Sequence, residues 1–159
     1  MTLPALIAQQ FDQGVKDTLL SMSGVQVIRR DAWIKDGHAM YGDVSAVIGL
    51  SGAVRGTCAL SMPSALAEDL VRRMLGQEEG SPVSDTDTRD GIGELVNMTA
   101  GRAKALLQQT PYKFDITLPT IITGAGHELY RRQDTPCYNF LYETERGEQF
   151  VLDLAFSVD

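Results

Sequence analysis

One long run of helical periodicity, between residues 85 and 109, most constrains what this chain can fold into. The residues on one side of it recur at helical spacing and are mostly apolar: Ile92, Leu95, Val96, Thr99, Ala103, Leu106 and Leu107. Ser84 and Asp87 have capping-box spacing at its start, and Pro111 cannot continue the helix. The pattern predicts a long amphipathic helix whose apolar side faces a sheet.

Two further helices and six strands are predicted from the rest of the chain. Apolar residues at helical spacing indicate helices over residues 3–21 and from Ser64 to just before Gly76. Apolar or alternating runs between turn residues indicate strands that begin at 25–28 and cover 43–50, 53–62, 113–123, 137–143 and 149–158. The alternation within 150–156 predicts a half-buried strand. A helix followed by three strands thus occurs twice, which indicates a duplicated architecture.

The size and composition of the chain indicate one ordinary globular domain covering residues 1–159. Its formal net charge of −7 argues against a sequence-independent grip on nucleic acid or anionic lipid, and it is also a common charge for a cytosolic protein. No run approaches the roughly 20 apolar residues of a membrane span, and the N-terminus has no basic segment of a secretion signal. We therefore expect a cytoplasmic protein.

The cysteines and histidines do not form a recognisable metal site. Cys58 and Cys137 each lie within an apolar, strand-like run and have no CxxC neighbour, so we expect two reduced, buried thiols. His38 and His127 are isolated in predicted loops, so no metal cluster is expected from the sequence.

The outer side of the long helix has an unusual composition. It carries these residues: Asp90, Glu94, Asn97, Gly101, Ala105 and Gln108. Glu94 and Asn97 are neighbours at i and i+3, with Gly93 and Gly101 close by, although a glycine costs about 1 kcal/mol relative to alanine inside a helix. Small residues around two polar groups predict a low docking platform. The alternative is an ordinary solvated face, with Gly93 easing the first turn and Gly101 packing on another element.

A wider motif around this helix resembles a known family. Asp90-x3-Glu94-x2-Asn97, followed after twenty-one residues by Pro119, resembles the signature of the CheX/CheC/FliY family of chemotaxis phosphatases. The segments VIGLSGAVRGTCALSM, RMLG, GELVNMTAGRAKALL and ITLPTIITG are similar to CheX, so the likeness covers roughly residues 40–125 closely. The resemblance implies a CheC/CheX-like α+β fold, with two long helices and a short helix packed on a mostly antiparallel six-stranded sheet.

The resemblance also implies an activity and roles for individual residues. Family members remove phosphate from the aspartyl phosphate of the response regulator CheY. Carried over, Glu94 would dock the regulator's lysine and Asn97 would orient the attacking water. The partner would be contacted by Asp90, Gly93, Gly101, Lys104 and Ala105. The chain would need no cofactor of its own, because the receiver domain supplies Mg²⁺.

Two more features follow from the resemblance. CheC-type members carry a second Glu/Asn pair on the first helix, whereas this chain has Gln9, Gln10 and Asp12 there and no asparagine before Asn97. It therefore resembles the single-site CheX branch. CheX proteins form homodimers, so the resemblance implies a homodimer, without naming the edge strand that would form it.

Three other functions stay open at this point. The chain could be a non-catalytic module that holds a response regulator, like flagellar-switch proteins. It could be a small-ligand sensor that uses the loop Gly124-Ala125-Gly126. It could also be a hydrolase with its own nucleophile, or with an acid pair drawn from Asp153 and the glutamates at 143, 145 and 148.

Overall fold

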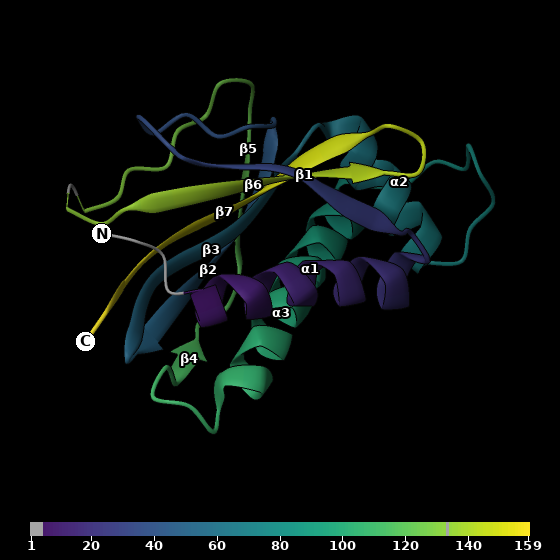
Figure 1. Ribbon diagram of the computed structural model, residues 1–159. Helices are drawn as coiled ribbons and strands as arrows, with labels where there is room; N and C mark the ends of the chain where they lie inside the picture. The colour runs from purple at the N-terminus through teal and green to yellow at the C-terminus, as the bar shows by residue number, and fades with distance from the viewer. Residues whose placement is uncertain (1–4, 133) are drawn as a thin grey trace.

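Two long helices cross one face of a twisted antiparallel sheet, as Figure 1 shows for the computed structural model. The structure describes residues 5–132 and 134–159. In chain order its elements are α1 (Ala5–Ser23), β1 (Val27–Ile34), β2 (Val44–Gly52), β3 (Val54–Met62), α2 (Ser64–Met74), α3 (Asp85–Leu107), β4 (Phe114–Ile116), β5 (Thr120–Thr123), β6 (Cys137–Thr144) and β7 (Gln149–Val158). The short helix α2 packs against both α1 and α3.

The order of the strands has an internal symmetry. The sheet runs β1-β6-β7-β3-β2-β4, with β5 also paired to β2, and every pairing between the described strands is antiparallel. Exchanging β1, β2 and β3 for β4/β5, β6 and β7 reverses this order onto itself. The two predicted repeats of a helix and three strands therefore form the two halves of one sheet, and the predicted duplication of architecture is present in the topology.

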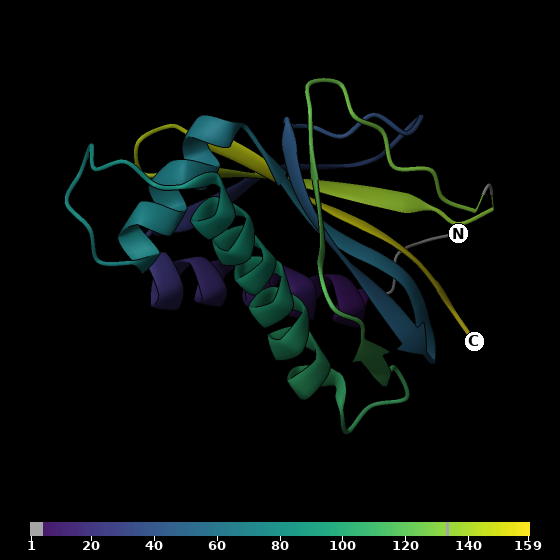
Figure 2. The ribbon, with the colours of Figure 1, turned by 180° about the vertical axis from the view of Figure 1, so that it is seen from behind.

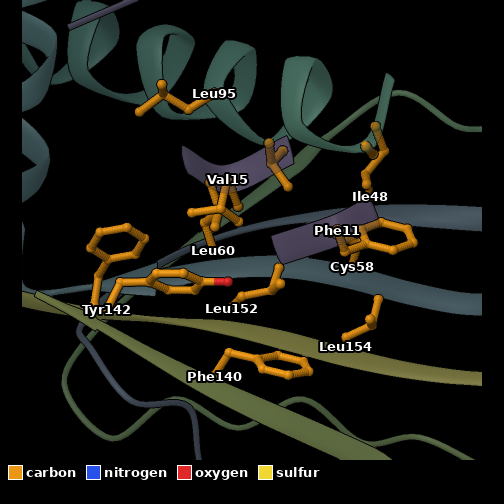
Figure 3. Close-up of a cluster of buried hydrophobic side chains, with 14 of the residues drawn as sticks. Phe11, Val15, Ile48, Cys58, Leu60, Leu95, Phe140, Tyr142, Leu152 and Leu154 are labelled. Carbon is orange, nitrogen blue, oxygen red and sulfur yellow. The ribbon is translucent and has the colours of Figure 1, made fainter. Parts of the chain in front are cut away.

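The main core lies between the helices and the sheet (Figure 3). Phe11 and Val15 of α1 and Leu95 of α3 point toward the strands, where they meet Leu60 and Leu152 among others. All five side chains are fully buried. Burying a side chain of this size contributes about 1.5–3 kcal/mol relative to leaving it exposed, so this layer fixes α3 on the sheet.

The two long helices touch each other at Gly14. A Cβ atom placed on Gly14 would lie 2.8 Å from the carbonyl oxygen of Thr99 on α3, which is closer than real Cβ contacts. A side chain at this position would push the helices apart, so a glycine is required here by a close approach of backbones.

Two of the predicted elements differ in the structure. Residues 3 and 4 of the predicted first helix lie outside the described residues, and α1 continues to Ser23. The predicted strand 113–123 is two strands, β4 and β5, so the sheet has seven strands and not six. The interruption falls at Thr117–Pro119, where a proline has no N–H group to donate to the neighbouring strand.

Two burial predictions were also wrong. Leu106 was expected to face the sheet but is 52% exposed, near the end of α3 that extends past α1 in Figure 1. The strand β7 was expected to be half-buried but is buried on both sides, including Asp153 at 1% exposure. The cause is the cover over the second face of the sheet, where Met40 and Leu129 pack on Val47.

None of the described helices has the length and apolar character needed to cross a membrane.

Candidate active site

Helix α3 presents its outer side from a fixed position. Ser84 caps the helix, because its hydroxyl oxygen accepts a hydrogen bond of 3.0 Å from the N–H of Asp87, as the spacing predicted. The opposite side of the helix is buried through Ile92, Leu95 and further residues down to Leu107. Figure 2 views the molecule from behind and shows α3 at the front, with no other element crossing it. Side chains on this surface are therefore held on a rigid support.

Glu94 and Asn97 lie on that surface, Glu94 exposed and Asn97 partly exposed. Among the described residues, neither side chain has a hydrogen-bond or ion-pair partner. Both border a surface hollow of about 400 Å³ between α3 and the segment that leads into β5. We call it the α3 hollow, and its lining residues are Arg89, Asp90, Gly93, Glu94, Asn97, Leu118, Pro119 and Ile121. Two unpaired polar groups beside a hollow can bind an incoming polar partner.

The motif residues that are far apart in the sequence meet at this hollow. Pro119 lies against Gly93, since a Cβ atom placed on Gly93 would be 3.5 Å from the Cγ atom of Pro119. Asp90 is exposed on the wall. Gly93 itself is buried and forms part of the floor of the hollow. The reason is the cover from Pro119 and Ile121.

The other predicted contact residues lie farther along α3, outside the hollow. Gly101 has open space above it, because a Cβ atom there would meet nothing within 4 Å, and Ala105 is exposed. Lys104 forms an ion pair with Asp115 at 3.1 Å, so part of its charge is already neutralised by its own chain. Gly101 and Ala105 leave a low, uncovered stretch of helix next to the hollow.

Leu118 is a hollow-lining residue that the sequence interpretation missed. It is 88% exposed, more than any other large apolar residue among those the structure describes. Its only signal in the sequence is an apolar residue directly before Pro119 inside a predicted strand, at the point where pairing has to stop.

A second polar cluster lies on the far side of the sheet, around Asp153. Its carboxylate accepts hydrogen bonds from Lys35 at 2.8 Å, from Asn139 at 3.1 Å and from Arg131. Burial alone would raise the pKa of Asp153, but the bond from Lys35 and the charges of Arg131 and Lys35 outweigh it and hold the pKa below its ordinary value. At 1% exposure this carboxylate is a structural anion and not an accessible acid.

The glutamates of the β6–β7 hairpin are also used structurally. Glu143 pairs with Arg30 at 2.7 Å, Glu145 accepts from the N–H of Gln26 at 3.1 Å, and Glu148 accepts from the hydroxyl of Thr144 at 3.2 Å. None of these contacts brings a glutamate to Asp153. The alternative of a catalytic acid pair therefore loses its geometric basis.

Both cysteines are free and buried, as predicted. Burial, with a further contribution from the negative charge of Asp153, raises the pKa of Cys137 to about 12. The same two causes raise the pKa of Cys58 as well. A thiol with a raised pKa stays protonated at neutral pH and is a poor nucleophile.

The remaining candidates from the sequence also have structural explanations. The residues Gly124–Gly126 form the turn after β5, and the ring of His127 bonds to the carbonyl of Gly124 at 2.8 Å and to the hydroxyl of Ser45 at 2.7 Å. Within the parts of the chain that the structure describes, no group of three or more histidine, cysteine, aspartate or glutamate side chains is placed to hold a metal ion.

Comparison with known proteins decides the family. The sequence matches the family model described as "Chemotaxis phosphatase CheX" over residues 44–143. The chain belongs to the CheX family. A relative, the CheY-P phosphatase CheX of Thermotoga maritima, is 36% identical over 78 residues, which is 49% of this chain and 50% of that protein. The aligned part thus spans about half the length of that relative.

Solved structures share the CheX fold over nearly the whole chain. The chemotaxis protein CheX of Desulfovibrio desulfuricans is 29% identical, with 96% of this chain and 99% of that chain covered at a TM-score of 0.84. A chain of the CheX–CheY–BeF₃–Mg²⁺ complex from Borrelia burgdorferi is 21% identical, with 94% of this chain and 96% of that chain covered at a TM-score of 0.74. At this identity the likeness is one of fold. These matches confirm the predicted CheC/CheX-like α+β fold.

Proposed function

We propose that this chain hydrolyses the aspartyl phosphate of a CheY-type receiver domain, with Asn97 positioning the water and Glu94 docking the receiver's lysine. The observation that carries the proposal is the pair of unpaired side chains, Glu94 and Asn97, side by side at the α3 hollow. The relatives of the chain support the proposal, since the Thermotoga maritima protein is named a CheY-P phosphatase and the Borrelia burgdorferi structure is a complex with CheY.

The reaction asks little of the enzyme beyond placement. Hydrolysis forms a bond from a water oxygen to phosphorus and breaks the bond from phosphorus to the aspartyl oxygen, so inorganic phosphate leaves and the carboxylate is restored. Because the transition state is loose, removing a proton from the water with a strong base accelerates the reaction little. Holding the water in line with the breaking bond accelerates it much more. The carboxamide of Asn97 suits this task, because its oxygen accepts a hydrogen bond from water and its charge does not change with pH.

Glu94 acts in docking. Its carboxylate, one helical turn from Asn97, pairs with a lysine ammonium of the receiver and sets the angle at which the acyl phosphate meets Asn97. An ion pair at the rim of an interface contributes about 0.2–1 kcal/mol, so most of its effect is on orientation. The docking surface in this proposal is completed by Asp90, Gly93, Gly101 and Ala105. Lys104 also contributes the charge that its ion pair with Asp115 does not neutralise.

The metal ion of the reaction comes with the partner. The Borrelia burgdorferi complex contains Mg²⁺ together with CheY and BeF₃. Mg²⁺ held by a receiver neutralises charge on the phosphoryl oxygens, and the present chain contributes the amide and the docking carboxylate. We also propose that this chain works in the cytoplasm.

A timed assay of phosphate loss tests the activity. Phosphorylated receivers are incubated with wild type, Asn97→Ala, Glu94→Ala and the matched control Gln108→Ala, which removes an exposed amide at the C-terminal end of α3. We expect Asn97→Ala to lower kcat by about 10²-fold, Glu94→Ala to raise KM by up to about fivefold, and the control to match wild type.

The assay also separates catalysis from binding alone. If no phosphorylated receiver loses phosphate faster with wild type, the enzymatic proposal fails. Retained binding of a receiver without turnover would then identify the chain as a non-catalytic module of the flagellar-switch kind.

We also propose a homodimer formed along β1. This strand is at one edge of the sheet and exposes Trp33 at 39% and Ile34 at 67%. An unpaired edge with apolar side chains can add a strand from a second copy. Light scattering at increasing concentration should give twice the chain mass for wild type and a monomer for Ile34→Lys. A monomeric wild type at all concentrations would refute the dimer.

A further inference from the structure

Leu118 is exposed on a segment whose backbone is fixed to the rest of the molecule. A single exposed leucine is unremarkable on a protein surface. Leu118, however, occupies the interruption between β4 and β5, at the edge of the sheet. Its 88% exposure leaves nearly the whole side chain in water.

Both neighbours of Leu118 are fixed to the rest of the molecule. Thr117 is bound to β2, because its N–H donates to the carbonyl of Gly49 at 3.1 Å and its hydroxyl oxygen accepts from the N–H of Gly49 at 2.8 Å. On the other side Pro119 packs over Gly93 of α3. A proline also restricts the preceding residue to extended backbone, so the backbone of Leu118 has little freedom.

Leu118 and the two proposed functional side chains share one hollow. Leu118 and Pro119 line its sheet side, while Glu94 and Asn97 line its helix side. The hollow is only about 400 Å³, a size that a few side chains of a partner would fill. A protein that brings an acyl phosphate to Asn97 therefore has to cover Leu118.

We propose that Leu118 is the apolar anchor for the receiver domain, seated against an apolar patch beside the receiver's phosphorylation pocket. This inference rests on the proposed function, because it takes the receiver as the occupant of the α3 hollow. The anchor supplies binding and leaves the chemical step to Asn97. Because the backbone on both sides of Leu118 is already held in place, little backbone conformational entropy is lost when the partner covers it.

The test separates KM from kcat for dephosphorylation of a receiver. We expect Leu118→Ser to raise KM by about tenfold or more, the effect of removing a buried leucine side chain, while kcat at saturating receiver stays within about twofold of wild type. Leu118→Met should restore KM. The matched control Leu20→Ser removes a 49% exposed leucine from α1 and should leave both constants unchanged.

Each other outcome overturns the inference in a distinguishable way. An active wild type with an unchanged KM in Leu118→Ser removes the anchor and leaves the phosphatase. A change of oligomeric mass in Leu118→Ser, measured by light scattering, assigns the leucine to a contact between copies. If wild type has no turnover, the Kd for a receiver carrying BeF₃ decides: an unchanged Kd in Leu118→Ser, or no binding by wild type, refutes the anchor.

Discussion

Gly101 should lower the stability of α3 while keeping its outer surface low enough for a partner to approach. It lies inside an unbroken helix of 23 residues, where a glycine costs about 1 kcal/mol relative to alanine. A Cβ atom at this position would meet nothing within 4 Å, so Gly101→Ala introduces no clash within the described structure. The substitution should therefore raise the free energy of unfolding by about 1 kcal/mol and raise Tm by about 2–4 °C.

The same methyl group should weaken the encounter with a receiver. Gly101 is one helical turn beyond Asn97 on the uncovered side of α3, where the partner's backbone comes close in the proposed complex. Forcing a methyl group into a packed contact costs about 1–3 kcal/mol, which is a rise in KM of about fivefold or more. Gly101→Ala should thus give a more stable protein that is a poorer phosphatase.

Urea unfolding and steady-state dephosphorylation measure the two effects, and Gly14→Ala is the control. That substitution brings the same gain in helix propensity, but its Cβ atom would lie 2.8 Å from the carbonyl oxygen of Thr99. It should therefore not stabilise the protein. If Gly101→Ala is stabilised and its KM is unchanged, the partner does not approach this part of α3. If it is not stabilised, the space above Gly101 is not open in solution.

Two further predictions concern the far side of the sheet. Asp153→Asn should cost about 3–5 kcal/mol at pH 7, because it leaves Lys35 and Arg131 buried without their anion. Since the folded pKa of Asp153 lies below its unfolded value, its contribution is complete above the unfolded value of about 3.9 and is lost as pH falls from there through the folded pKa. The difference in unfolding free energy between wild type and variant should therefore narrow progressively below about pH 4 in urea unfolding, and a difference that does not narrow as pH falls would contradict this. Cys58 and Cys137, whose pKa values are raised, should react with iodoacetamide only in urea, and labelling of the native protein would contradict it.

Local patterns in the sequence were sufficient for most elements. The start of α3 at Ser84 and the hairpin of β6 and β7 were predicted closely, since capping, helical spacing and strand alternation are properties of neighbouring residues. The outward position of Glu94 followed in the same way from the helix period. The proximity of Glu94 and Asn97 to Pro119 was expected only from the resemblance to a family, because it joins two segments that are distant in the sequence.

Features that depend on distant segments were not predicted. The burial of Asp153 results from the cover on the second face of the sheet, and no alternation within β7 reveals that cover. The ion pair between Lys104 and Asp115 likewise joins α3 to β4. The break at Leu118 was readable in principle, because Pro119 cannot pair inside a sheet, but its consequence, an exposed leucine at the site, needed the three-dimensional structure.

The symmetry of the sheet does not by itself favour either long helix for the proposed site. α1 and α3 occupy equivalent positions on the two halves, so the fold alone would allow a site on either. On α1, however, Asp12 accepts a hydrogen bond from the hydroxyl of Tyr142 at 2.8 Å and pairs with Lys16 at 3.1 Å. The carboxylate at the corresponding region of α1 is thus used to hold the sheet, whereas Glu94 and Asn97 have no described partner within the chain. A polar side chain is available to another protein only if its own fold leaves it unpaired, and this difference, rather than the topology, is the reason to propose the site on α3.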